Sequence, residues 1–398
     1  TYAGDIDRYS ESEQIDWINS GRTDAEQSGK GELRFQGELE MLFKCANHAP
    51  AADHGHSQTV TNGKKHLTVD IHCHVHIPEV DAMTEGQWGP EDIPAIHFAS
   101  DLTRGLNVEQ NEILMPKLTQ PELRIADMDA SGVDMQAISP APWHYCYWAD
   151  PDLGRETAVY TNDHMAELGA KYPDRLIPMC TVPLQAPELA VAELERCHKE
   201  HGMRGVEIGT NVGGKELTRI GLEKFFAKVE ELDMLIFMHP IGTTEGDRMK
   251  DHYFTNLIGH PLESALAVGH LVFDGYLERH PNLKVCVAHG GGYLPSYYGR
   301  FDHPYPTRAD VHGELPHPPS HYLKKLHFDT VVFTEMQLRH LIEAWGPDHI
   351  LMGTDYPYDM AETDPVGHVD SVEGLSDSDK ALVWGGNAAR LLNLAAKA

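Results

Sequence analysis

The sequence is poor in basic residues and has no long apolar run. Its 398 residues include 32 Lys or Arg and 61 Asp or Glu, which gives a formal net charge of −29. A surface this acidic repels a phosphate backbone, whose binding depends on Lys and Arg displacing counterions. No apolar run approaches the roughly 20 residues of a membrane span, and no basic segment followed by an apolar one begins the chain. We therefore expect a soluble protein with neither a nucleic acid nor a membrane as partner.

Cysteine is also scarce, and its placement carries information. The six cysteines are scattered and form no C-x-x-C motif. This pattern is typical of neither a disulfide framework nor a zinc ribbon. The sequence therefore predicts a reducing compartment, which we interpret as the cytoplasm.

From residue 67 onwards, short apolar runs rich in β-branched residues alternate with stretches of helical spacing. There are eight such runs, at residues 67–72, 135–139, 176–182, 205–209, 235–239, 284–289, 326–332 and 349–355. This alternation predicts an α/β protein with a (β/α)8 TIM barrel. A doubly wound open sheet is the alternative, but no glycine-rich phosphate fingerprint follows the first run.

Residues 1–66 are polar and irregular, and they contain turn-prone stretches. We therefore predict a polar N-terminal extension over residues 1–66, followed by the barrel domain over residues 67–398. About 60 residues separate the first two apolar runs, so we expect an excursion over the barrel mouth there.

Histidine is abundant, with 26 residues, and position decides which of them matter. Active sites of such barrels lie at the C-terminal ends of the strands. Four runs end in residues suited to a metal centre: His72 and His74 end the first run, and His239, His289 and Asp355 end the fifth, sixth and eighth. The strand ends therefore predict a cluster of imidazoles with one carboxylate.

Two histidines two residues apart on a strand point the same way, so His72 and His74 can bind one ion together. His76 continues this period, so spacing alone leaves the register open. We expect His72, His74, His239 and Asp355 to hold one divalent metal, zinc or alternatively manganese, with one position open for water or substrate. Such an ion lowers the pKa of a bound water to about 7 and makes hydroxide available at neutral pH.

His289 ends the strand that follows the strand of His239, which places a second imidazole near the metal centre. We predict that His289 acts as general base and acid, and that Asp355 can both bind the ion and shuttle a proton. A purely structural histidine is the alternative for His289. Glu207, inside the fourth run, is interpreted as a supporting acid rather than a base.

An ordered set of motifs resembles the amidohydrolase superfamily, and it is most similar to the branch containing α-amino-β-carboxymuconate-ε-semialdehyde decarboxylase. These motifs are residues 70–74 (DIHCH), 122–140, 185–197, 238–240 (MHP), 284–292 (KVCVAHGGG) and 353–358 (GTDYPY). The resemblance implies a (β/α)8 barrel, one divalent metal, usually zinc, and non-oxidative removal of a carboxylate from a conjugated or aromatic acid. It assigns the same four ligands and makes His289 the base.

In that family, an arginine eleven residues after the H-G-G-G histidine reaches into the partner subunit's site and holds the substrate carboxylate. Arg300 has this position, so the resemblance implies a homodimer or a larger homo-oligomer. Two departures concern the substrate pocket. Glu112 stands where the family has a substrate-binding arginine, with Arg104 the nearest earlier base, and Ile241 replaces a tryptophan. These departures predict a substrate pocket that differs from that of the family decarboxylase.

The leading hypothesis is therefore a metal-dependent decarboxylase of a small aromatic or muconate-like carboxylic acid, using a metal-bound water or hydroxide. The alternative on the same site is a hydrolase of a carbon–carbon or amide bond, or a hydratase, acting on a ring-cleavage product. A non-catalytic protein with a structural metal is a third hypothesis, but a structural site needs no neighbouring base such as His289.

Overall fold

The computed structural model describes residues 66–394, and all of them lie within one compact unit, His56–Ala398. The predicted extension over residues 1–66 falls, apart from His66, outside the described residues. Between residues 66 and 394, no helix is both long enough and apolar enough to cross a bilayer.

Each of the eight predicted runs overlaps a parallel strand. These strands are β1 (Val69–Val75), β2 (Met135–Pro140), β3 (Leu176–Pro178), β4 (Gly205–Ile208), β7 (Leu235–Met238), β8 (Lys284–Val287), β9 (His327–Asp329) and β10 (Ile350–Leu351). Some are shorter than their runs because the backbone leaves the extended region at the run's end. His289 and Asp355, for example, have φ values of 56° and 66°. Residues with positive φ values lie outside the extended region and cannot continue the hydrogen bonding of a parallel sheet.

The strands form two sheets, in the orders β1-β2-β3 and β10-β9-β8-β7-β4. Parallel bridges join the two sheets at both edges, one between Cys180 and Val206 and the other between Cys73 and Tyr356. The eight strands therefore follow one another in chain order around a ring, as a (β/α)8 barrel requires. A short antiparallel hairpin, β5 (Asn211–Val212) and β6 (Lys215–Glu216), follows β4.

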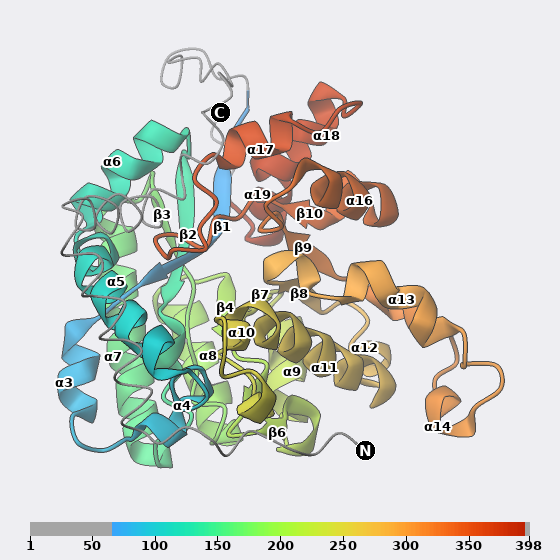
Figure 1. Cartoon of the computed structure of the whole chain (residues 1–398), viewed down its shortest axis with the longest axis horizontal. Helices are drawn as coiled ribbons and strands as arrows, with labels where there is room; N and C mark the ends of the chain where they lie inside the picture. Colours follow the sequence, from blue (N-terminus) through green and yellow to red (C-terminus); the bar gives the residue numbers. More distant parts are fainter. Residues whose placement is uncertain (1–65, 395–398) are drawn as a thin grey trace, which may run out of the picture. The chain divides into compact units, whose positions relative to one another are not determined.

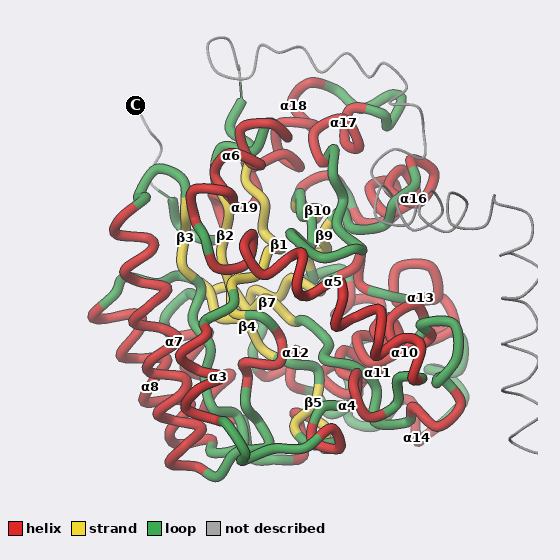
Figure 2. Tube along the Cα trace, turned by 60° about the vertical axis from the view of Figure 1, so that its left-hand side comes forward, coloured by secondary structure: helices red, strands yellow, loops and turns green. Residues whose placement is uncertain are grey.

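Helices surround the strands, which lie together in the middle of the unit (Figure 2). After the excursion described below, the helices are α6 (Pro121–Ser131), α7 (Pro151–Lys171), α8 (Pro187–Glu200), α9 (Glu223–Glu231), α10 (Phe254–Leu257), α11 (Gly259–Phe273), α12 (Tyr276–Arg279), α13 (Leu294–Asp302), α14 (Ala309–His312), α15 (Pro319–Leu323), α16 (Glu335–Trp345), α17 (Pro365–Asp370), α18 (Asp377–Ala381) and α19 (Asn387–Leu391). Local signals set many boundaries. The Asp150 carboxylate, for instance, accepts from two backbone N–H groups at the start of α7, which opens with Pro151.

The excursion predicted between the first two strands is helical. It contains α3 (Pro78–Thr84), α4 (Pro94–His97) and the 19-residue α5 (Asp101–Thr119). The Gln110 amide of α5 donates to the Asp359 carboxylate at 3.3 Å, and Asp359 follows the last strand. The excursion therefore lies on the side of the barrel where the strands end.

The core has two clusters, and the smaller one brings together buried side chains from the strands and from α19. It includes Val69, Ile71, Leu235 and Phe237, and the Phe237 ring centroid lies 5.0 Å from that of His72. The larger cluster includes side chains of the strands and of the surrounding helices. The predicted site thus borders a dry apolar core, where unpaired polar atoms are costly.

Candidate active site

The structure brings the four predicted metal ligands together. His72 and His74 lie in β1, His239 follows β7 and Asp355 follows β10, and one ligand atom from each lies within 4.8 Å of all the others. The Nε2 atoms of His72 and His74 are each 3.2 Å from Oδ1 of Asp355. All four side chains are buried.

The imidazole rings meet at steep angles rather than stacking. His72 and His74 are inclined by 86°, and the His239 ring makes an angle of 75° with each of them. Within residues 66–394, Nε2 of His72 and His74, both ring nitrogens of His239 and Oδ1 of Asp355 are buried and have no hydrogen-bond partner outside this set. Each such atom costs about 1–3 kcal/mol if it stays unpaired. This convergent set of nitrogen and carboxylate donors fits a divalent metal ion.

The protonation of Asp355 suits this role. Burial alone would raise the pKa of its carboxyl group, but the neighbouring His72, His289 and His74 hold that pKa well below its usual range. An ionised carboxylate is the form that binds a metal.

A second cluster, formed by His76, Asp81 and His144, differs from the first. Its two rings are inclined by only 31°, with centroids 4.6 Å apart. Their Nε2 atoms face the Asp81 carboxylate at 2.8 and 3.0 Å, so hydrogen bonds satisfy these nitrogens. His76, which continues the H-x-H period, therefore pairs with Asp81 and is not one of the four residues grouped as metal ligands.

Asp329 is a functional residue that the sequence analysis missed. Its Oδ2 lies 2.6 Å from Nδ1 of His72, and its two carboxylate oxygens accept the backbone N–H groups of His289 at 2.9 Å and Gly290 at 2.7 Å. Asp329 thus fixes the His72 ring with Nε2 directed at the convergent set. The sequence does contain a signal for this residue, because Asp329 is a charged residue within the apolar run 326–332.

Two further buried groups hold the ligand strand in place. The Asp70 carboxylate accepts from the backbone N–H and the hydroxyl of Thr354, at 3.0 and 2.7 Å, and from the His72 N–H at 3.0 Å. The Arg124 guanidinium donates to the His74 carbonyl. The Asp70 contacts tie β1 to the segment that carries Asp355, and the Arg124 contact ties β1 to α6.

His289 lies beside the four ligands, as predicted. Its ring centroid is 4.9 Å from that of His239, and its Nε2 is 3.6 Å from Oδ2 of Asp355. The side chain is 15% exposed, whereas those of His72 and His74 are fully buried. His289 can therefore meet both the ligand set and an incoming small molecule.

Glu207 and two aromatic rings line the region behind His74. Glu207 is fully buried in β4, its Oε1 lies 3.8 Å from Nδ1 of His74, and burial raises the pKa of its carboxyl group to about 8. The Tyr358 ring lies 5.3 Å from the His74 ring, and Trp143 lies 5.9 Å from Tyr358. Glu207 thus lies near a ligand without a hydrogen bond to it, and its role as a supporting acid stays a prediction.

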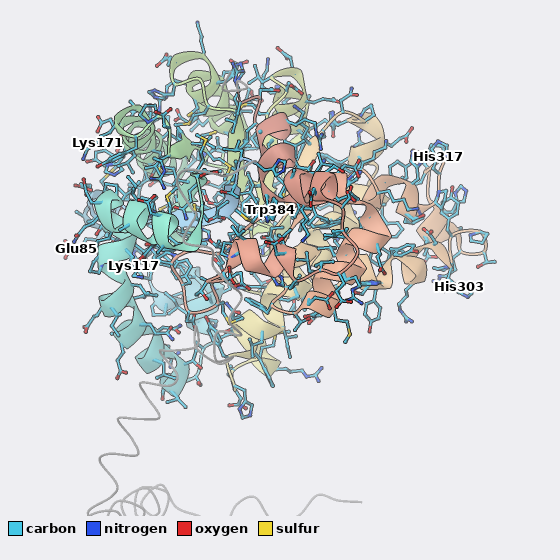
Figure 3. The ribbon with its side chains drawn as sticks, turned by 90° about the horizontal axis from the view of Figure 1, so that it is seen from above. Glu85, Lys117, Lys171, His303, His317 and Trp384 are labelled. Atoms are coloured by element: carbon cyan, nitrogen blue, oxygen red, sulfur yellow. The ribbon has the colours of Figure 1, made fainter. Side chains whose placement is uncertain are left out.

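Arg300 is not drawn into the ligand cluster. It is exposed on α13, which together with α14 extends away from the strands at one edge of the unit (Figure 1). Seen from above, His303 and His317 lie at that edge, on the opposite side from Lys117 and Lys171 (Figure 3). Among the described residues, the Arg300 guanidinium has no hydrogen-bond or ion-pair partner.

The two departures from the family pattern lie on α5 and after β7. Arg104 pairs with Asp101 and donates to the Ala99 carbonyl at 2.8 Å, so its guanidinium is engaged at the start of its own helix. Glu112 is exposed, and Ile241 packs against the larger core cluster. Neither replacement supplies the cation or the indole of the family pattern.

Comparisons with known proteins identify the family of the chain. The sequence profile of the family Amidohydrolase matches residues 69–394. The chain is 36% identical to 2-amino-3-carboxymuconate-6-semialdehyde decarboxylase of Dictyostelium discoideum, over 69% of this chain and 77% of that protein. It is 27% identical to gamma-resorcylate decarboxylase of Polaromonas sp. (strain JS666), over 75% and 97%.

A solved structure shares the fold. The crystal structure of 5-carboxyvanillate decarboxylase from Sphingomonas paucimobilis superposes with a TM-score of 0.73 at 25% identity, covering 82% of this chain and 99% of that one. The profile match spans most of the chain, including every strand and every predicted ligand. The protein therefore belongs to the amidohydrolase family.

Proposed function

We propose that this protein is a metal-dependent decarboxylase that removes carbon dioxide, without oxidation, from a small aromatic or muconate-like carboxylic acid. The observation that carries this proposal is the convergence of unpartnered donors from His72, His74, His239 and Asp355 beside the partly exposed His289. The relatives reported above, which are decarboxylases of such acids, support it.

In this proposal the four ligands hold one divalent ion, zinc or alternatively manganese. When bound, the ion supplies a Lewis acid that polarises an oxygen substituent of the substrate. Asp329 keeps His72 oriented, and Asp355 remains ionised beside the histidines. The donor types leave two ions, because a set of imidazole and carboxylate ligands suits both zinc and manganese.

His289 moves the proton in this scheme. Loss of carbon dioxide breaks one carbon–carbon bond and leaves its electron pair on the substrate carbon, which must then take up a proton. The Nε2 atom of His289 faces Oδ2 of Asp355 at 3.6 Å, so the carboxylate can orient the ring for the transfer. We therefore assign the proton transfer to His289, with Asp355 as its partner.

Arg300 is proposed to bind the substrate carboxylate in the site of a partner subunit. It is exposed on α13, near Tyr293, Tyr297 and Tyr298, whose side chains are 39%, 60% and 37% exposed. Exposed aromatic residues beside an arginine are typical of protein–protein contacts. A homodimer or larger homo-oligomer in the cytoplasm, with residues 67–398 as the catalytic domain, completes the proposal.

The test is to incubate the metal-loaded protein with a panel of hydroxylated aromatic and muconate acids, while following carbon dioxide release and product mass. We expect at least one acid to lose the mass of carbon dioxide. Cleavage or hydration products without carbon dioxide would instead identify a hydrolase or a hydratase.

Two variants examine the residue assignments. We expect His289→Asn to retain the metal and to lose roughly 10²- to 10⁴-fold in kcat, because it removes the proton carrier. Asp355→Ala should lose the metal itself. Normal turnover in the first variant, or full metal occupancy in the second, would contradict the corresponding assignment.

A further inference from the structure

His260 is a histidine next to the site that neither the ligand set nor the proton transfer uses. It lies at the start of α11, and its ring stacks on that of His289, with centroids 5.7 Å apart and planes inclined by 29°. The His239 ring lies 6.1 Å away. His260 therefore borders the metal centre on the side of α11, beyond His239 and His289.

The backbone is built to bring His260 this close. Gly292 ends the glycine turn after His289 with a φ of 62°, and a Cβ atom at Gly292 would lie 2.5 Å from the Pro261 carbonyl oxygen. Only glycine permits that approach at this φ. The first turn of α11 is thus held against the turn that carries His289.

The hydrogen bonding of His260 leaves one ring nitrogen for a ligand. Nδ1 lies 3.5 Å from the Asn256 amide nitrogen, which can donate to it. A ring that accepts at Nδ1 carries its proton at Nε2. Among residues 66–394, Nε2 of His260 has no hydrogen-bond partner, and it is not one of the buried polar side-chain atoms. This nitrogen is therefore accessible to a ligand.

We propose that His260 recognises the substrate: its Nε2–H donates a hydrogen bond to an acceptor oxygen, a hydroxyl or a carbonyl, that the substrate carries in addition to its carboxylate and to the oxygen substituent polarised at the metal centre. This inference rests on the proposed function and narrows the substrate class to acids with such a second oxygen substituent.

The test is a binding measurement on the metal-loaded protein with matched probes. 2-Hydroxybenzoate is compared by calorimetry with the four dihydroxybenzoates that add one hydroxyl group at position 3, 4, 5 or 6. We expect at least one dihydroxybenzoate to bind about tenfold more tightly than 2-hydroxybenzoate. His260→Phe should abolish this preference and leave the affinity for 2-hydroxybenzoate nearly unchanged.

Two variants separate recognition from packing. His260→Phe keeps an aromatic face against His289 and removes the N–H, whereas His260→Gln keeps a donor near the position of Nε2 and removes the ring. We expect His260→Gln to keep the preference for a dihydroxybenzoate over 2-hydroxybenzoate, and His260→Phe to lose it. The proposal is wrong if His260→Phe weakens all five acids equally, if it weakens none, or if the wild-type protein shows no preference or no binding.

This measurement does not depend on turnover. A preference that depends on His260, in a protein that releases no carbon dioxide from any acid, would refute the proposed decarboxylation and leave the recognition role standing. Carbon dioxide release without such a preference would refute the recognition role of His260 and leave the proposed decarboxylation standing. With an accepted substrate, His260→Phe should raise KM while kcat at saturation stays nearly constant.

Discussion

At the scale of single residues, the site depends on acids that are not ligands. Asp329 is fully buried and divides its two oxygens between the His72 ring and the backbone of the glycine turn. One carboxylate therefore sets both the orientation of a ligand and the position of His289. Such supporting acids raise ligand basicity and fix the ring that binds the metal.

We expect Asp329→Asn to weaken metal binding by roughly 10- to 100-fold, because the amide cannot supply the negative charge that polarises His72. Competition with a chelator of known affinity measures this change. Asp163→Asn is the matched control, since Asp163 pairs with Arg196 on the outer helices. Equal metal affinity in wild type and Asp329→Asn would show that His72 needs no anionic partner.

Glu207 should make the stability of the metal-free protein depend on pH. Its carboxyl group ordinarily has a pKa of 4.5, and burial raises that pKa to about 8 in the folded chain. Unfolding between these values releases a proton, so the free energy of unfolding falls as pH rises from 5 to 8, by at most about 1.4 kcal/mol per pH unit from this group.

Glu207→Gln has no proton to release, so its free energy of unfolding should fall less steeply over the same range. Denaturant unfolding of both metal-free proteins at pH 5, 6, 7 and 8 gives the comparison. Glu188→Gln, at an exposed ion pair with Lys224, serves as the control. Parallel pH profiles for wild type and Glu207→Gln would mean that Glu207 is ionised in the folded protein.

At the scale of secondary structure, the glycine turn after β8 is the element on which the site depends. His289 and the three glycines that follow it all have positive φ values, between 56° and 74°. Backbone of this kind persists where surrounding contacts fix it, here the Asp329 carboxylate and the first turn of α11.

We expect Gly292→Ala to lower the melting temperature and the activity together, because its methyl group would meet the Pro261 carbonyl oxygen at 2.5 Å. Gly313→Ala is a matched control, since Gly313 also has a positive φ, 51°, and open space around it. The control should lose about 1–3 kcal/mol from its backbone conformation alone, because its φ of 51° and ψ of −131° form a combination that favours glycine. An equal loss in both variants would mean that α11 can move away from the turn at no cost.

At the scale of the whole molecule, the described barrel holds the ligand cluster and His289 but leaves Arg300 exposed at one edge. The proposal that Arg300 acts in a partner subunit therefore makes activity a property of the assembly. It also predicts that two different inactive variants can complement each other.

Arg300→Ala and His289→Asn should each have low activity alone, and their equimolar mixture, after subunit exchange, should recover about a quarter of wild-type activity. Half of the dimers are then mixed, and each mixed dimer has one site with both residues intact. Sedimentation should show that both variants remain dimeric. Activity that stays at the level of the separate variants would place Arg300 in its own subunit's site or outside any site.

The sequence by itself determined the strands, their order and the candidate ligands. Each strand of a parallel barrel is an apolar run, and the strands end at the active site, so His72, His74, His239, His289 and Asp355 could be selected by position in the chain. The structure brings all five together, and the family comparison supports the fold.

Only the tertiary structure separated His76 from His74, because the two have the same spacing and differ in the partners they meet, such as Asp81. It also revealed the contacts of Asp329 with His72 and of His260 with His289. The contact between His72 and Asp329 joins residues 257 positions apart, and His260 reaches His289 because Gly292 leaves room for α11. Contacts of this kind depend on how distant segments meet in space, which no local pattern of residues encodes.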